Sequence, residues 1–183
     1  MCWPFFDVGD KMKKVILLSG IHGVGKGFIS RQIEKKINIP IYEASKLIRT
    51  NGGLINKNKK VNNVNSNQDL LVNSINNLVD YDLFILDGHT CLINNENHVE
   101  LIDIDIFRRI NVIGIVLVYD DVNIISERLD KRDNTHFDKL LLDDLQKAEV
   151  LNTEKLSKEL SIPLLFFKNA DDIDRLINFI KDL

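Results

Sequence analysis

The sequence predicts an α/β protein with three αβα layers, in which helices cover both faces of a central parallel sheet of about five strands. Short apolar runs alternate with amphipathic, helix-like segments along the 183 residues. Such alternation favours parallel strands joined by right-handed crossovers. The runs lack polar alternation, which is typical of strands buried on both faces. No internal repeat or linker divides the sequence, so we expect one domain.

Five apolar stretches mark the expected strands. The first covers Val15 to Leu18 and ends at a glycine-rich turn. The other four lie in the stretches IPIYEAS, DLFILDGH, NVIGIVLVYD and SIPLLFF, two of which have a proline near their start, as sheet edges and strand starts allow. Between the third and fourth strands, CLINNENHVELI at residues 91–102 predicts a β-hairpin or a turned loop.

Apolar residues at helical spacing predict the helices between these strands. The first helix begins at Lys26, and its expected buried stripe is Phe28, Ile29, Ile33 and Ile37. Residues 51–67 are rich in Asn, Gly and Lys and predict a mobile surface segment, either a closing lid or a docking surface. The other helices are expected at residues 44–49, 68–79, 104–110, 122–129, 137–160 (continuous or broken near Asn152) and 173–183.

Composition and charge narrow the classes of function. The net charge is −3 and the pI is about 5.8, which gives no electrostatic footprint for duplex nucleic acid or an anionic membrane. A nucleic-acid partner is therefore not expected, although cations gathered in one cleft remain compatible with this charge. Cys2 and Cys91 fit no disulfide scaffold or metal-ligand spacing and predict free thiols in a reducing compartment. No apolar run reaches the ~18 residues of a membrane span, and no signal peptide is evident, so we expect a cytoplasmic protein.

The first residues predict a short appendage before the domain. Met12 begins MKKVILLSG, which is a natural place for a chain to start. We therefore expect residues 1–12 to be an appendage, either an upstream translation start or a surface arm. Residues 13–183 are expected to form the domain.

The stretch GIHGVGKG, residues 20–27, has the spacing of a phosphate-binding loop. Gly20-x-x-Gly23-x-Gly25-Lys26 falls between a predicted strand and a predicted helix, which is the context that such a loop requires. Glycines let backbone N–H groups approach phosphates, and the helix N-terminus adds partial positive charge. Lys26 supplies a mobile cation for the phosphate being transferred. The residues expected to bind ATP are Gly20, His22, Gly23, Val24, Gly25, Lys26, Gly27 and Phe28.

This loop resembles the G-x-P-G-x-G-K-G-T loop of adenylate kinases and related nucleoside monophosphate kinases. Gly27 matches the glycine after the lysine, whereas His22 replaces the proline and Phe28 replaces the threonine. The threonine hydroxyl helps to hold the nucleotide's phosphates in that family, and phenylalanine has none. The resemblance continues in order through residues 13–183. It implies a P-loop kinase fold with ATP and Mg²⁺ as cofactors.

Further segments resemble the acceptor and lid parts of these kinases. ASKLIR at 44–49 is similar to T-G-D-L-L-R, and Arg49 falls on the family's arginine. FILDGHT at 84–90 resembles V-L-D-G-F-P-R, but its arginine is missing here. SERLDKRDN resembles the R-x-x-x-R start of the lid that closes over ATP, which implies a lid at about residues 128–137. An acceptor-binding region at about residues 43–80 is implied as well, and the expected acceptor contacts are Ser45, Arg49, Gly88 and His89.

The candidate catalytic residues are Lys26, Asp87, Arg128 and Arg132. Arg128 and Arg132 are four residues apart, hence on one helical face, where both could reach the γ-phosphate; surface ion pairing is the alternative. Asp87, at a strand end, would hold Mg²⁺ through water or accept a proton from an attacking hydroxyl. A turn-capping aspartate is the alternative for Asp87.

Two classes of function are compatible with these residues. The first is an ATP-dependent phosphotransferase whose favoured acceptor is a nucleoside monophosphate, with a hydroxyl acceptor (a metabolite or a polynucleotide 5′-hydroxyl) as the variant. The second is a nucleotide-binding regulatory or interaction module with weak or no turnover, which Phe28 and the missing hydroxyls suggest. The expected partners are a nucleotide and a small-molecule acceptor. A protein partner or a homo-oligomer is compatible with either class.

Overall fold

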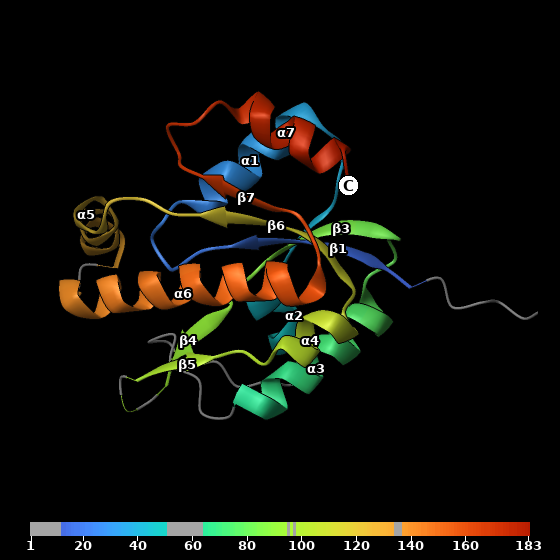
Figure 1. Ribbon diagram of the computed structural model, residues 1–183, viewed down its shortest axis with the longest axis horizontal. Helices are drawn as coiled ribbons and strands as arrows, with labels where there is room; N and C mark the ends of the chain where they lie inside the picture. Colours follow the sequence, from blue (N-terminus) through green and yellow to red (C-terminus); the bar gives the residue numbers. More distant parts are fainter. Residues whose placement is uncertain (1–11, 51–63, 95, 97, 134–136) are drawn as a thin grey trace, which may run out of the picture.

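Five parallel strands form a central sheet in the order β2-β3-β1-β6-β7 (Figure 1). The computed structural model describes residues 12–50, 64–94, 96, 98–133 and 137–183 of the chain. The strands of this sheet are β1 Lys14–Ser19, β2 Ile41–Glu43, β3 Leu83–Asp87, β6 Val112–Val118 and β7 Leu164–Phe167. The expected parallel sheet of about five strands is confirmed.

Helices cover both faces of this sheet and complete the three αβα layers. Helices α1 Lys26–Lys36 and α7 Ile173–Lys181 lie together on one face (Figure 1). The opposite face carries α2 Ala44–Thr50, α3 Val64–Leu78, α4 Ile104–Arg109 and the long α6 Lys139–Leu160. Helix α5 Val122–Asp133 follows the carboxyl end of β6.

The hydrophobic core is divided between the two faces of the sheet. One cluster packs Ile29 and Ile33 of α1 against α7 and against Ile16 of β1. The other packs α2, α3 and α4 against the alternate side chains of the same strands, such as Leu17. Because the middle of β1 is buried on both faces, its residues Val15 to Leu18 are all apolar.

Strand β1 lies at the centre of the sheet, and its position gathers the candidate residues. It pairs with β3 on one side, where Leu18 lies opposite Asp87, and with β6 on the other side. The turn after β1 and the turn after β3 therefore begin at the same edge of the sheet. Ligands of open parallel sheets bind at this carboxyl edge, where the strand order reverses.

A small antiparallel hairpin stands beside this edge. It consists of β4 Cys91–Ile93 and β5 Val99–Leu101, which pair in the register Cys91 to Leu101. The hairpin interpretation of residues 91–102 is confirmed, and α6 packs against both of its strands.

Two expectations about local structure are wrong. Phe28 is 48% exposed, because the face of α1 that packs on the sheet is formed by Ile29 and Ile33. Residues 64–67 are helical and start α3, where Asn67 is buried, so this end of the expected surface segment is part of a helix. Of the two alternatives for residues 137–160, the continuous helix is confirmed: α6 runs through Asn152, whose side chain donates to the Thr90 carbonyl and faces inward.

Some predictions fall on residues that the structure does not describe. These are the appendage at residues 1–11, most of the expected surface segment (51–63) and part of the expected lid (134–136). Among the described helices, none combines the length and the hydrophobicity that a membrane crossing needs. The cytoplasmic location stays a prediction.

Candidate active site

The phosphate-binding loop connects β1 to α1 and carries three glycines with positive φ. These are Gly20, Gly23 and Gly25, with φ angles of 143°, 82° and 112°. At Gly23 a Cβ atom would lie 2.5 Å from the Leu129 side chain, so the backbone path and the packing both require glycine. At Gly27, by contrast, a Cβ atom would meet nothing within 4 Å. The loop is therefore shaped by its backbone, with open space where the helix begins.

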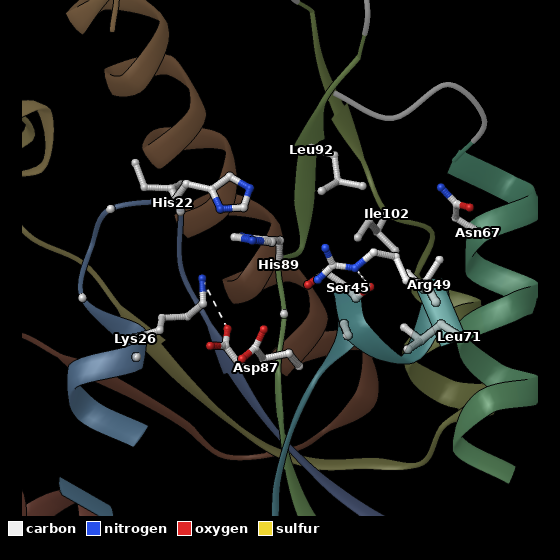
Figure 2. Close-up of a pocket in the computed structure, with 18 of the residues that line it drawn as sticks. His22, Lys26, Ser45, Arg49, Asn67, Leu71, Asp87, His89, Leu92 and Ile102 are labelled. Carbon is white, nitrogen blue, oxygen red and sulfur yellow. Dashed lines mark hydrogen bonds and ion pairs between the residues drawn. The ribbon is translucent and has the colours of Figure 1, made fainter. Parts of the chain in front are cut away.

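Lys26 crosses this loop and points at Asp87 (Figure 2). Its side chain is only 7% exposed, its ammonium donates to the Gly20 carbonyl, and its Nζ lies 3.5 Å from Asp87 Oδ1. Burial raises the pKa of the Asp87 carboxyl, while the charge of Lys26 opposes this shift. The predicted cation and the predicted carboxylate thus form an ion pair on the cavity floor.

Two side chains hold the loop from behind through one carbonyl. Val24 O accepts hydrogen bonds from Arg128 Nη1 at 3.0 Å and from Asn169 Nδ2 at 2.7 Å. Arg128 also pairs with Asp120 Oδ2 at 2.9 Å. The guanidinium expected to reach the γ-phosphate therefore supports the loop in this structure, and sequence spacing could not reveal that contact.

A cavity of about 830 Å³ extends from this loop to helices α2 and α3. Most predicted site residues line it, and Figure 2 shows how several of them converge. Gly20 and Val24 do not line the cavity: the Val24 side chain is buried, and both residues contribute through their carbonyls. The predicted residues that line it are His22, Gly23, Gly25, Lys26, Gly27, Phe28, Ser45, Arg49, Asp87, Gly88, His89, Arg128 and Arg132.

The cavity is cationic although the chain as a whole carries a net charge of −3. Its lining has five basic side chains, Lys26, Arg31, Arg49, Arg128 and Arg132, and two carboxylates, Glu43 and Asp87. Such a concentration of one sign attracts an anionic ligand.

His22 and His89 lie against each other above the Lys26–Asp87 pair (Figure 2). Their ring centroids are 4.3 Å apart with a tilt of 58°. His22 belongs to the phosphate loop and His89 follows β3, so the imidazoles join the two strand ends across the middle of the cavity. His22 therefore places an imidazole in the cavity beside His89.

The end of the cavity beside α2 and α3 is built from side chains of several elements. Arg49 Nε donates to the Ser45 carbonyl at 3.1 Å, which holds the guanidinium at the end of α2 (Figure 2). Asn67 and Gln68, each 8% exposed, bring two amide groups from α3. Apolar walls complete this end and comprise Ile48, Leu71, Leu92, Ile102 and Ile106.

Several residues that line or support the cavity were missed by the sequence reasoning. Arg31 follows Phe28 by one helical turn, and this spacing on α1 was the available signal. Asn67 was assigned to a surface segment because its neighbourhood is rich in asparagine. Glu149 of α6, 1% exposed, carries no signal in the sequence, since it sits among other charged residues of a long helix.

Cys91 is a free, buried thiol at the start of the hairpin. Burial, and then the negative charge of Glu149, raise the pKa of this thiol far above its ordinary value. It is therefore an inert structural group, in keeping with the expected free thiols.

ATP and Mg²⁺ fit the residues present. The glycine cradle and Lys26 suit a chain of phosphates. Protein-bound Mg²⁺ in kinases needs one or two carboxylates beside the substrate's phosphates, and Asp87 supplies one. Within the described part of the chain, no three His, Cys, Asp or Glu side chains gather into a metal cage. Neither Gly27 nor Phe28 offers the hydroxyl that many such loops place on the metal.

Comparisons with known proteins agree with the fold of this chain. A family model described as "AAA domain" matches residues 19–146. The structure resembles shikimate kinase from Acinetobacter baumannii in complex with shikimate, at 13% identity and a TM-score of 0.60, over 94% of this chain and 95% of that one. It also resembles deoxyadenosine kinase from M. mycoides with dCMP and dCDP bound, at 17% identity and a TM-score of 0.53, over 92% and 96% of the two chains.

A third similar structure is an uncharacterised protein from Eubacterium ventriosum, at 13% identity and a TM-score of 0.52, over 93% of this chain and 100% of that one. Among curated proteins, no sequence matches the chain. At these identities the structural likeness shows the fold alone, whereas the family match spans more than half of the chain. The chain belongs to the P-loop NTPase family that the AAA-domain model describes, and its fold is that of the P-loop kinases of the nucleoside monophosphate kinase-like type.

Proposed function

We propose that this protein is an ATP-dependent phosphotransferase of the nucleotide and nucleoside kinase type, with a nucleoside monophosphate as its favoured acceptor. The observation that carries the proposal is one continuous cationic cavity that runs from the phosphate loop to α2 and α3. A single cavity with a phosphate cradle at one end has room for a donor and an acceptor together. The domain of residues 13–183 is proposed as the unit that performs the reaction.

The donor end of the cavity is suited to the phosphates of ATP. The loop backbone and the N-terminus of α1 would bind the β- and γ-phosphates, and Lys26 would leave the Gly20 carbonyl to neutralise them. Arg128 and Arg132 line the same end and would close over the nucleotide as part of a lid at about residues 128–137. The lid assignment remains a proposal of its own.

The acceptor end is suited to a base that carries a phosphate. Apolar walls such as Ile48 and Leu71 would pack on a flat ring, and the amides of Asn67 and Gln68 could pair with its polar edge. Arg49 would neutralise the acceptor phosphate. Arg31 adds a second guanidinium near the loop. The arginine that nucleoside monophosphate kinases carry shortly after their Asp-Gly pair is absent from this chain, which has Thr90 and Cys91 there.

The transfer itself requires little covalent help from the protein. An oxygen of the acceptor phosphate forms a bond to the γ-phosphorus, and the bond from that phosphorus to the bridging oxygen of ADP breaks. Lys26, Arg128 and Arg132 would stabilise the charge on the moving phosphoryl group. Mg²⁺ would neutralise charge on the phosphates, and Asp87 would hold it through water.

A hydroxyl acceptor is the second candidate, and the environment of Asp87 favours it. Burial raises the pKa of this carboxyl, which makes it a stronger base. The acceptor hydroxyl would pass its proton to Asp87 while its oxygen attacks the γ-phosphorus. Shikimate, the ligand of the similar kinase, belongs to this class of acceptor.

One experiment separates these candidates. The purified protein is incubated with γ-labelled ATP, Mg²⁺ and, in turn, nucleoside monophosphates, nucleosides, shikimate and oligonucleotides with a 5′-hydroxyl. Label on a monophosphate, lost in Lys26→Ala, is the expected result. Label on a hydroxyl compound would replace the favoured acceptor, and ATP binding without any transfer would contradict the kinase and favour a nucleotide-binding module.

A further inference from the structure

Glu149 places a carboxylate at the junction between the two ends of the cavity without lining the cavity itself. It lies in the middle of α6 and is 1% exposed. Its Oε1 accepts hydrogen bonds from the Ser19 hydroxyl and from the Gly20 backbone N–H, the latter at 3.0 Å. These two residues are the end of β1 and the first residue of the phosphate loop.

The same carboxylate also binds the chain that follows β3. The Thr90 backbone N–H donates to both oxygens at 3.0 Å, and the Cys91 backbone N–H donates to Oε2 at 2.9 Å. The Cys91 thiol adds a contact to Oε2 at 3.1 Å. Thr90 directly follows His89, and Cys91 begins the hairpin whose Leu92 lines the acceptor end.

All of these contacts are donated to the carboxylate. An ionised carboxylate is an acceptor only and satisfies them without competition. A glutamine side chain has the same shape, but its amide nitrogen would point its own N–H groups at the N–H groups that donate to Glu149. The arrangement therefore requires a carboxylate at this position, and shape alone is not sufficient.

Neighbouring residues on the same face of α6 continue this connection. Gln146 exchanges hydrogen bonds with the backbone of Asp120, just after β6, at 3.2 and 2.9 Å. Asn152 Nδ2 donates to the Thr90 carbonyl at 2.7 Å. One polar face of a single helix thus binds the chain just after β6, β1 and β3, and Glu149 stands in the middle.

We propose that Glu149 is a positioning residue for phosphoryl transfer, which holds the phosphate loop at a set distance from the acceptor wall. Glu149 contacts no cavity surface, so it acts through Gly20 and through the segment from Thr90 to Leu92. Transfer depends steeply on the separation of the reacting atoms, whereas the binding of each substrate depends on its own end of the cavity. This inference rests on the proposed kinase function.

The test compares Glu149→Gln with Glu154→Gln, the same change on the same helix away from these contacts. With the acceptor found by the labelling experiment, Glu149→Gln is expected to lower kcat about 100-fold, the scale of a misplaced reacting group, and to leave both KM values within about threefold. Glu154→Gln is expected to match the wild type. A kcat within twofold of the wild type, or a loss confined to one KM, would overturn the proposal.

A second variant and a second measurement cover other outcomes. If Glu149→Gln does not fold, Ser19→Ala removes one donor only, and a lowered kcat with unchanged KM values is expected. A kcat equal to the wild type would overturn the proposal.

Amide hydrogen exchange tests the connection without any acceptor. Gly20, Thr90 and Cys91 should lose protection together in Glu149→Gln and keep it in Glu154→Gln. If the wild type transfers label to no acceptor, the kinase function fails; retained protection at one of the two segments in Glu149→Gln would refute the connection itself.

Discussion

The two ends of the cavity are built in different ways. At the proposed donor end, backbone groups form the surface, and side-chain contacts from Arg128, Asn169 and Glu149 hold the loop. At the proposed acceptor end, side chains form the surface, and they come from α2, α3, the hairpin, α4 and the segment before it. A backbone cradle suits any chain of phosphates, whereas a set of side chains can differ from one acceptor to another. We therefore expect a change at the donor end to affect every reaction of this protein. A change at the acceptor end should affect the choice of acceptor.

The largest effect is expected from Gly23→Ala at the donor end. The methyl group would collide with Leu129 at a backbone angle that favours glycine, at a cost of about 1–3 kcal/mol in the free energy of unfolding. ATP binding should be lost as well, because the loop must change its path. Thermal melting and ATP titration measure the two effects.

Gly27→Ala is the matched control for that change. Its added methyl group meets nothing within 4 Å of the protein, so the stability of the folded chain should stay close to that of the wild type. An equal loss of melting temperature in the two variants would show that the backbone path at Gly23 is not what requires glycine.

An intermediate effect, restricted to one substrate, is expected from Arg49→Ala. Loss of a guanidinium that binds an acceptor phosphate should raise the KM for that acceptor about 10- to 100-fold. The KM for ATP should not change, since the loop lies at the other end. Steady-state kinetics with each substrate varied in turn provide the measurement.

Arg109→Ala controls for the loss of an exposed arginine. Arg109 pairs with Asp69 at 2.7 Å outside the cavity, so both KM values should stay unchanged. An Arg49 variant that loses affinity for ATP as much as for the acceptor would contradict the division of the cavity into two ends.

The smallest effect concerns Asp87, which lies where the two ends meet. Burial raises its folded-state pKa above the ordinary value of 3.8, so the folded chain releases this proton at higher pH than the unfolded chain does. The unfolded chain therefore binds fewer protons in that window, and the folded state loses stability as the pH rises through it. Asp87→Asn removes this titration.

Melting temperatures of the wild type and of Asp87→Asn, measured at a series of pH values, test this sign in the nucleotide-free protein. The wild type should lose stability relative to the variant as the pH rises from below 3.8 through the raised pKa. A difference that is constant across the series, or that changes in the opposite direction, would show that the ion pair with Lys26 outweighs burial.

The elements of the fold and the phosphate-binding loop could be predicted from the sequence. Buried parallel strands leave continuous apolar runs, and a phosphate loop needs glycines and a lysine at set spacing, so both are visible in consecutive residues. The departures at His22 and Phe28 were visible in the same way. These features are local because the backbone conformation of a short segment creates them.

The contacts that support and complete the site could be seen only in the tertiary structure. The strand order brings Asp87 beside the end of β1, and the fold sets Arg128 against Val24, 104 residues before it. Asn67, Arg31 and Glu149 come from three helices, and each has a surface-like sequence neighbourhood. Glu149 binds Gly20 and Thr90 at sequence separations of 129 and 59 residues. Contacts of this range arise from the packing of α6 against the strand ends, and no periodicity within one segment of the chain encodes them.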